Sequence, residues 1–316
     1  MHAIGIDIGG TKIAGGLVDE DGNIVRESRV ATPTGSADEI VSAVVNLIRD
    51  LSADHKVLGA GVAFAGFIDA NQAEVLYAPN LSFRNEPFKA KLEAQLDIPV
   101  LLENDANAAG WAEYRYGAGR GCKHMVMLTI GTGVGGAVIS NSRMLRGGFG
   151  IAGELGHIRV VPEGRPCGCG ARGCIEQYGS GTALLRSAIG LADSAGSAGE
   201  RLRQLRAEHG GLKGEQVYQA IIEGDHGALG LLSELGSWLG QTIATLSAVL
   251  DPEIVVIGGG VSAAGDLLLQ PIREAYLANM PAHGFRPELQ IRTAEFVNDA
   301  GVVGAADLVR LAWSQR

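Results

Sequence analysis

The chain has 316 residues, of which 46% are hydrophobic and 19% charged, and its net charge is −9. This composition predicts a folded protein, and the acidic balance argues against a surface that coats nucleic acid. A chain of this length exceeds what one hydrophobic core usually supports, so we expect two domains. No apolar run approaches the roughly 18 residues of a membrane span, and the start carries no secretory signal pattern. We therefore expect a cytoplasmic protein.

The first third of the chain alternates between predicted strands and helices. The expected strands lie within 3–10, 12–25 (with a turn at Asp21–Gly22), 56–69 and 98–105. The expected helices cover 36–51, where Ser36 is the N-cap, then 85–97 and 105–117. Such alternation is typical of an α/β domain with a mixed sheet.

The sequence contains a weak internal repeat. An apolar strand followed by a glycine-rich turn occurs at 2–18, again at 124–140, and in shorter form at 253–262. This predicts two related α/β lobes. We expect a small domain at 1–104 plus 299–316, where the helix at 298–316 packs back on the first lobe. The large domain then covers 105–298, with a surface loop and an exposed helix at 190–211.

Two glycine turns, "DIGGTK" (Asp7–Lys12) and "GTGVGG" (Gly131–Gly136), are candidate phosphate sites. Glycine lets the backbone approach a polyanion, and successive N–H groups bind phosphate oxygens. Thr11 and Thr132 add hydroxyl donors. Neither turn has the P-loop or dinucleotide-binding pattern. One such turn alone would equally be a plain hairpin, but two at matching places favour a phosphate clamp.

Asn104 and Asp105 stand where a predicted strand ends and a helix begins. Asp105 could simply cap the helix, since Asp is common at N-caps. It could also act as a general base that takes a proton from an attacking hydroxyl, a role that contributes roughly 10²–10⁴ in rate. Asn104 would then hold a neighbouring hydroxyl. The two interpretations are compatible.

Three of the four cysteines fall within eight residues, and His157 precedes them by ten. His157, Cys167, Cys169 and Cys174 form a Cys3His set, which is usual for structural zinc. Reactive or redox cysteines are the alternative, but Cys-x-Cys is not the Cys-x-x-Cys redox spacing. A closed four-ligand site leaves no open position for chemistry. We therefore expect zinc to shape this loop without catalysing.

Two carboxylates flank the predicted zinc loop. Glu154 lies three residues before His157, and Glu176 lies two residues after Cys174. If one imidazole nitrogen binds zinc, the other remains an N–H that can donate to a ligand. Two carboxylates and an N–H converging on one point suit the vicinal hydroxyls of a sugar. The alternative is that both glutamates are solvated surface charges.

The motifs together resemble one known family over nearly the whole chain. "DIGGTK", "LLENDANAAGWAEY", "TIGTGVGG", "GELGHI" followed by "CGCGARGCIEQYGSG", and "VIGGGVS" occur in the order typical of the ROK family (repressors, open reading frames, kinases). Within that family the chain is most similar to actinobacterial ATP-dependent glucokinases. The resemblance implies a two-lobed α/β fold like that of actin and hexokinase (ribonuclease H-like), with the site in the cleft between the lobes.

The resemblance also implies roles for individual residues. Asp105 is the catalytic base, and the zinc ligands are His157, Cys167, Cys169 and Cys174. The sugar-binding residues are Gly66, Asn80, Asn104, Asp105, Glu154, His157 and Glu176. The nucleotide-binding residues are Gly9, Gly10, Thr11, Lys12, Thr132, Gly133 and Gly260. The resemblance also implies that Mg²⁺ accompanies the ATP.

The expected reaction is ATP-dependent phosphorylation of glucose at the 6-hydroxyl, and the resemblance implies a homodimer or homotetramer. Other hexoses remain open as substrates: mannose, N-acetylmannosamine, N-acetylglucosamine or fructose. Polyphosphate is a lesser alternative donor. A family repressor would carry a DNA-binding segment of some 80 residues before "DIGGTK", which here begins at Asp7. A sugar sensor without activity is disfavoured because Asp105 is retained.

Overall fold

The structure is a computed structural model that describes residues 1–78, 81 and 83–314. By spatial contact the chain divides into two compact units. Unit 1 comprises Met1–Lys123, Ala137–Gly153 and Glu295–Arg316, and unit 2 comprises His124–Gly136 and Glu154–Ala294. The domain boundaries that we expect from the sequence, after 104 and after 298, stay a prediction.

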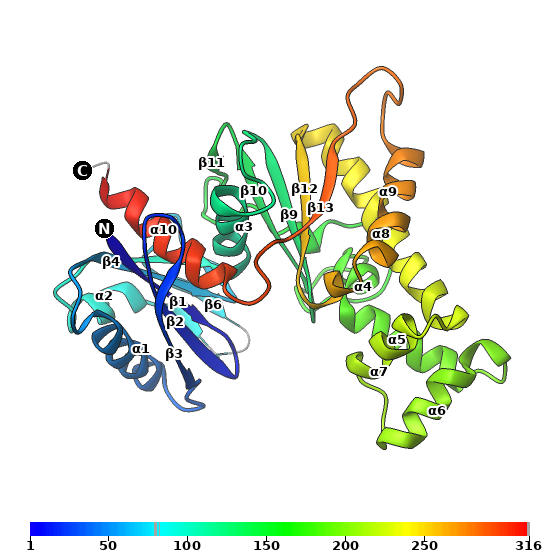
Figure 1. Ribbon diagram of the computed structural model, residues 1–316, viewed down its shortest axis with the longest axis horizontal. Helices are drawn as coiled ribbons and strands as arrows, with labels where there is room; N and C mark the ends of the chain where they lie inside the picture. The colour runs from blue at the N-terminus through cyan, green and yellow to red at the C-terminus, as the bar shows by residue number, and fades with distance from the viewer. Residues whose placement is uncertain (79–80, 82, 315–316) are drawn as a thin grey trace. The chain divides into compact units, whose positions relative to one another are not determined.

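Unit 1 is built on a five-stranded sheet in the order β3-β2-β1-β4-β8 (Figure 1). β1, β2 and β3 pair antiparallel, whereas β1, β4 and β8 run parallel. The strands are β1 His2–Ile8, β2 Lys12–Val18, β3 Ile24–Ala31, β4 Val57–Phe64 and β8 Val100–Asn104. A second, small sheet contains β5 Phe67–Ile68, β6 Val75–Ala78 and β7 Phe83–Glu86. The strands predicted in this region are confirmed.

The second five-stranded sheet repeats the strand order of the first. Its order is β11-β10-β9-β12-β13, so β9 takes the place of β1 and β12 that of β4. β12 runs parallel to both β9 and β13. The strands are β9 Met125–Ile130, β10 Val134–Ser140, β11 Arg143–Met144, β12 Ile254–Gly258 and β13 Gln290–Thr293. The predicted internal repeat is confirmed, and each glycine turn joins the first two strands of its repeat.

The helices of unit 1 follow the sequence pattern with one exception. α1 (Ala37–Ser52) begins at the predicted cap, where the Ser36 side chain accepts a hydrogen bond from the Glu39 N–H and Glu39 completes a capping box. α3 (Asp105–Tyr116) also lies where we expect it. The helix expected over 85–97 is shorter, because β7 extends to Glu86 and α2 covers only Phe88–Glu93.

The last helix, α10 (Ala300–Ser314), packs against β1, β4 and α3 within unit 1, as predicted. In Figure 1 it is the red helix beside the blue strands. Glycines permit this close packing. A Cβ on Gly5 would lie 1.8 Å from the Val302 carbonyl oxygen, and one on Gly304 would lie 1.7 Å from the Ala108 carbonyl oxygen. Neither position can therefore carry a larger residue without moving the helix.

A buried carboxylate holds α10 against α3. The Asp307 side chain accepts hydrogen bonds from Trp111 Nε1 (2.9 Å) and the Tyr116 hydroxyl (2.6 Å) of α3. Arg310 Nη1 donates to the same carboxylate at 2.7 Å. Burial and the hydrogen bond to Asp307 raise the pKa of Tyr116 to about 12. The network fixes α3, whose first residue is Asp105.

Unit 2 is rich in helices. The bounds are η2 Leu155–His157, α4 Glu176–Gly179, α5 Gly181–Asp193, η3 Ser197–Gly199, α6 Glu200–His209, α7 Gly214–Ile222, α8 His226–Leu250, η4 Gly260–Ala264 and α9 Asp266–Asn279. The loop expected from 190 begins later, because α5 continues to Asp193. The helix expected to be exposed, α6, buries Leu202 and Leu205.

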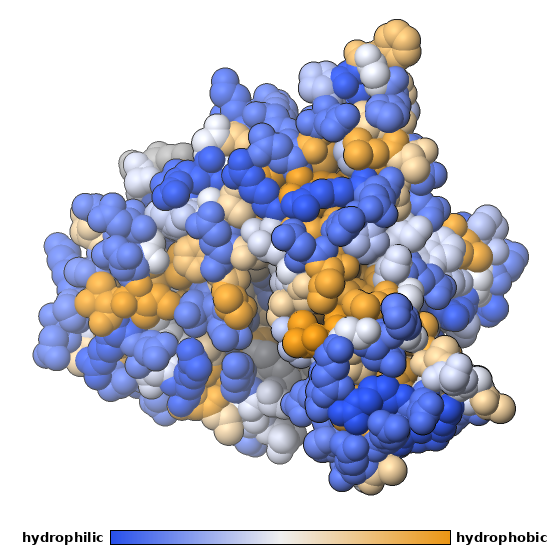
Figure 2. Space-filling view, turned by 45° about the vertical axis from the view of Figure 1, so that its right-hand side comes forward, coloured by the Kyte–Doolittle hydropathy of each residue, from blue (hydrophilic) through white to orange (hydrophobic). Residues whose placement is uncertain are grey.

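Within the described part of the chain, no helix has both the length and the apolar character needed to cross a bilayer. Hydrophilic residues cover most of the face in Figure 2, with smaller apolar patches between them.

Candidate active site and metal centre

The first glycine turn joins β1 to β2 in unit 1. The Gly9 N–H donates to the Lys12 carbonyl (3.0 Å), and the Thr32 hydroxyl donates to the Gly9 carbonyl (2.7 Å). Gly10 and Thr11 are exposed, so their backbone is accessible to a ligand. The turn is thus held at its base and open at its tip, which is the arrangement that a phosphate-binding backbone requires.

Asp7 is a candidate functional residue that the sequence reasoning missed. It is the next-to-last residue of β1 and stands two residues before Gly9. Burial raises the pKa of its carboxyl group, and the nearby positive charge of Lys12 opposes that shift. Carboxylates beside bound phosphates commonly hold Mg²⁺. The signal in the sequence was an acidic residue inside an otherwise apolar strand, directly before a glycine turn.

Asn104, and not Asp105, caps α3. Asn104 has extended backbone angles, and its side-chain oxygen accepts from the Asn107 N–H at 3.0 Å. Asp105 is already the first helical residue, with Oδ1 2.9 Å from the Ala106 N–H. The expectation that Asp105 caps the helix is therefore wrong, because the backbone becomes helical one residue earlier than a cap at Asp105 requires. The N-terminal turn of α3 still favours a negative charge at Asp105.

Gly66 lies next to Asn104, and both are predicted to bind the sugar. The Asn104 side-chain amide donates to the Gly66 carbonyl at 3.0 Å. A Cβ on Gly66 would lie 2.5 Å from the Tyr77 carbonyl oxygen, so this turn needs glycine. Asn80, the other sugar contact expected nearby, lies outside the described residues.

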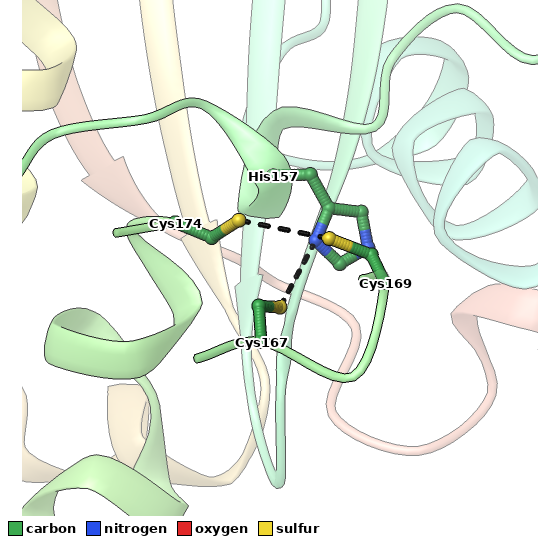
Figure 3. Close-up of side chains that lie close together, drawn as sticks. All are labelled: His157, Cys167, Cys169 and Cys174. Atoms are coloured by element: carbon green, nitrogen blue, oxygen red, sulfur yellow. Dashed lines mark hydrogen bonds between the residues drawn. The ribbon is translucent and has the colours of Figure 1, made fainter. Parts of the chain in front are cut away.

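His157, Cys167, Cys169 and Cys174 gather at one point in unit 2. Their ligand atoms all lie within 4.8 Å of one another, and Figure 3 shows the four side chains pointing toward a common centre. Cys167 Sγ is 3.7 Å from His157 Nδ1, and the Sγ atoms of Cys169 and Cys174 are also 3.7 Å apart. Tetrahedral zinc with bonds of about 2.3 Å to sulfur places its ligands roughly 3.5–3.8 Å apart. The donor set and its spacing fit zinc.

The short loop that carries the cysteines depends on glycine. Gly170 and Gly173 have φ angles of +89° and +76°, which side chains rarely adopt. A Cβ on Gly173 would also lie 1.7 Å from the Val161 carbonyl oxygen. Burial raises the pKa of the Cys174 thiol to about 12. A coordinated cation reverses such a shift, because metal binding deprotonates thiols.

The two carboxylates lie beside this cluster. Glu154 Oε2 is 3.9 Å from His157 Nε2, the ring nitrogen that does not face Cys167. Glu176 Oε1 is 3.6 Å from Cys167 Sγ, and its Oε2 accepts from the Val134 N–H at 3.3 Å. Burial raises the pKa of Glu154, while the charge of His157 opposes that shift and the charge of Glu176 adds to it. A ligand with several hydroxyl groups would meet two acceptors and one N–H donor here.

A pocket of about 640 Å³ lies within unit 2. The second glycine turn lines it through Gly131 and Thr132, and Gly260 of η4 lines it as well. The Thr182 hydroxyl donates to the Thr132 carbonyl at 2.7 Å, which joins the turn to α5. The other lining residues, most of them apolar, are Gly181, Thr182, Leu184, Leu185, Gly214, Glu215, Val217, Tyr218, Ile221, Leu232, Val261, Ala263 and Ala264.

The pocket is the second feature that the sequence reasoning missed. Its walls come from α5, α7 and η4, which lie far apart in the chain. Glycine turns next to apolar side chains suit a ligand with a phosphate part and a flat apolar part. Gly133, predicted to bind nucleotide, also lies against Glu176, since a Cβ there would be 2.4 Å from Glu176 Oε2; its nucleotide role stays a prediction.

The predicted site residues thus form one group in each unit. Unit 1 holds Gly9, Gly10, Thr11, Lys12, Gly66, Asn104 and Asp105. Unit 2 holds Thr132, Gly133, Glu154, His157, Cys167, Cys169, Cys174, Glu176 and Gly260.

The repeated sheets, the glycine turns and the Cys3His loop agree with what comparison with known proteins finds. The ROK family profile matches residues 3–312. The chain belongs to the ROK family. Its mixed α/β fold is of the actin/hexokinase class, as predicted.

Particular relatives are similar along their whole length. A glucokinase of Streptomyces coelicolor is 42% identical over 308 residues, which cover 97% of each chain. An N-acetylmannosamine kinase of Escherichia fergusonii is 34% identical, over 98% of this chain and 99% of that one. Among solved structures, a ROK family glucokinase from Streptomyces griseus in complex with glucose and AMPPNP matches with a TM-score of 0.86. That match has 43% identity and covers 98% of this chain and 100% of the other.

Proposed function

We propose that this chain is an ATP-dependent glucokinase, which transfers the γ-phosphoryl group of ATP to the 6-hydroxyl of D-glucose and yields glucose 6-phosphate. The observation that carries the proposal is the group formed by Glu154, His157 and Glu176 beside the Cys3His cluster. The identity of 42% with the Streptomyces coelicolor glucokinase supports glucose over other hexoses.

The proposed sugar contacts form one set in each unit. Glu154 and Glu176 accept hydrogen bonds from sugar hydroxyls, and His157 Nε2–H donates one, since Nδ1 faces the cysteines. Asn104, held by Gly66, and Asp105 bind the hydroxyls near the reacting oxygen. Asn80 completes this proposed set. Acceptors outnumber donors, which suits the several O–H groups of a hexose.

Asp105 acts as the general base. As the sugar oxygen attacks the γ-phosphorus in line, the Asp105 carboxylate accepts the proton of the 6-hydroxyl. Asp105 is the first residue of α3, where the helix N-terminus interacts favourably with a negative charge. Exclusion of water from the site would protect the phosphoryl group from hydrolysis.

The nucleotide binds through backbone groups at its phosphates and apolar contacts at its base. Gly9, Gly10, Thr11 and Lys12 on one turn, and Thr132, Gly133 and Gly260 in unit 2, are the proposed phosphate contacts. The apolar part of the 640 Å³ pocket takes the adenine ring. Asp7 is placed to hold the Mg²⁺ that neutralises phosphate charge.

Zinc, held by His157, Cys167, Cys169 and Cys174, supplies structural stabilisation of the sugar-binding loop when bound. The zinc residues themselves orient the site: His157 carries a sugar-binding N–H, and Cys174 is two residues from Glu176. We expect the protein to work in the cytoplasm, where thiols stay reduced, as a homodimer or homotetramer.

A panel of sugars tests the proposal. Purified protein with Mg-ATP is assayed against glucose, mannose, fructose, N-acetylglucosamine and N-acetylmannosamine. We expect the highest kcat/KM for glucose. A higher kcat/KM for an amino sugar would show that the protein is a kinase with a substrate other than glucose. If none of the five sugars is phosphorylated, the result would favour a sugar sensor without activity. The same assay with polyphosphate in place of ATP tests polyphosphate as an alternative phosphoryl donor.

The nucleotide pocket has its own test. Ala263 is exposed and lines the pocket from η4, so Ala263→Trp would fill the space proposed for adenine without disturbing the core. We expect the KM for ATP to rise roughly tenfold or more, as loss of ring contacts worth about 1.4 kcal/mol implies. The KM for glucose should stay within twofold of the parent's, a range of about 0.4 kcal/mol.

Ala207→Trp, on the exposed side of α6, is the matched control. An unchanged KM for ATP in Ala263→Trp would remove adenine from this pocket.

A further inference from the structure

Glu103 is a buried carboxylate that stands directly before the proposed sugar contact and base, Asn104 and Asp105. It is the fourth residue of β8 and only 2% exposed. A buried carboxylate is unfavourable unless it is paired and hydrogen-bonded. Its partners therefore show which segments this position holds together.

Three segments of unit 1 converge on Glu103. Oε2 accepts from Arg146 Nε at 2.7 Å and from Gln72 Nε2 at 3.1 Å. Oε1 accepts from Asn107 Nδ2 in the first turn of α3 and from the backbone N–H of Asn104, both at 3.0 Å. The carboxylate thus bonds on one side to the strand end and helix start that carry Asp105. On the other side it bonds to two loops.

Arg146 is the partner that supplies the opposite charge. Its Nη2 also lies 2.7 Å from Glu103 Oε2, so two donors of one guanidinium meet a single oxygen. Arg146 is only 27% exposed at its side chain, which makes this a shielded pair. Among the described residues, Arg146 forms the one ion pair recorded for Glu103.

The loop that follows Arg146 is fixed to the same region. The Ala152 N–H donates to the Arg146 carbonyl at 3.0 Å and closes the loop. Gly150 in this loop has φ +87°, and a Cβ on it would lie 2.6 Å from the Ala70 N atom. The loop therefore packs against the turn that also carries Gln72. Both loops and the start of α3 thus meet at the Glu103 carboxylate.

We propose that Arg146 is a positioning residue for the phosphoryl transfer, acting through Glu103 to hold Asn104 and Asp105 in register with the loop 146–153. This inference rests on the proposed kinase function. Arg146 does not touch the reacting atoms in this account. Removing its side chain leaves Glu103 buried with no compensating charge, so the carboxylate shifts toward water and displaces the backbone at Asn104 to which it is hydrogen-bonded. Small displacements of a base are costly, and about 1 Å can reduce the rate 10²-fold.

The test compares Arg146→Met with Arg143→Met, which removes the same charge from the exposed β11 position nearby. We expect kcat to fall roughly 10- to 100-fold in Arg146→Met. The KM for ATP should change by less than about threefold, because the hydrogen bonds of this pair described above go to none of the proposed nucleotide contacts. Arg143→Met should match the parent. Arg146→Lys restores the charge with a single ammonium in place of two guanidinium donors, and should recover part of the kcat that Arg146→Met loses.

A double-variant cycle separates positioning from simple loss of stability. In Glu103→Gln/Arg146→Met the buried charge is gone, so the folded state is retained even if Arg146→Met alone unfolds. If Arg146 acts through Glu103, kcat of the double variant lies within about threefold of the lower single variant. Additive losses, no rescue by lysine, or Arg146→Met indistinguishable from Arg143→Met would each overturn the inference. Glucose turnover by the parent is measured first: its absence refutes the proposed function, whereas an active parent with an unaffected Arg146→Met refutes the positioning role alone.

Discussion

Asp105→Asn is expected to lower kcat for glucose phosphorylation by roughly 10²–10⁴-fold, the usual contribution of a general base. The amide has the same shape as the carboxylate and can still hydrogen-bond a sugar hydroxyl, but it cannot accept the proton. Glucose binding, measured by calorimetry or by fluorescence of the tryptophans, should therefore stay within about threefold of the parent value. The expected signature is loss of turnover with binding retained.

The control for this variant is Asp97→Asn, an exposed acid that precedes the same strand, β8. It should behave as the parent. The helix itself is not at risk, because the cap is supplied by Asn104 and not by Asp105. A loss of kcat of less than about tenfold in Asp105→Asn would be smaller than any loss expected for a general base. In that case another group accepts the proton of the 6-hydroxyl.

Cys169→Ser is expected to reduce both bound zinc and glucose affinity. Serine is a poor zinc ligand, and loss of one of four ligands removes much of a binding energy that reaches about 10–16 kcal/mol in small zinc peptides. The loop then no longer fixes His157 and Glu176, so we expect the KM for glucose to rise at least tenfold, about 1.4 kcal/mol of lost binding. Zinc content is measured by elemental analysis of the purified protein, independently of activity.

The chain offers a matched control, because its fourth cysteine, Cys122, lies outside the cluster. Cys122→Ser should retain one zinc per chain and the parent KM. A parent protein that contains no zinc, or a Cys169→Ser protein that loses zinc with glucose affinity intact, contradicts the proposed role of the loop.

The sequence is most informative where the signal is local. The Cys3His set could be predicted because all four residues lie within 18 positions of the chain, and folding brings them together. The glycine turns were predictable for the same reason. Their two copies occupy equivalent places in sheets with the same strand order.

Features that depend on distant segments escaped the sequence reasoning. The apolar pocket draws its walls from helices that periodicity can predict singly but cannot place side by side. The sequence places Glu103 in a predicted strand but does not indicate its partner. The ion pair with Arg146 forms only in the folded structure. At Asn104–Asp105 the sequence reasoning considered only Asp105 as the cap, although Asn is equally favoured at that position. Which of them caps depends on where the backbone turns helical, and that follows from the end of β8.

The close packing of α10 on β1 has a consequence for synthesis of the protein. β1 begins at His2 and α10 at Ala300, so a ribosome makes the strand long before the helix that covers it. Unit 2, at 124–136 and 154–294, lies wholly between them and can fold first. Until α10 emerges, the sheet face at Gly5 and at Gly61, where a Cβ would lie 1.9 Å from the Ala305 carbonyl oxygen of α10, stays uncovered. The nascent chain must therefore keep this apolar face of the sheet from contacting other chains until its C-terminal segment arrives.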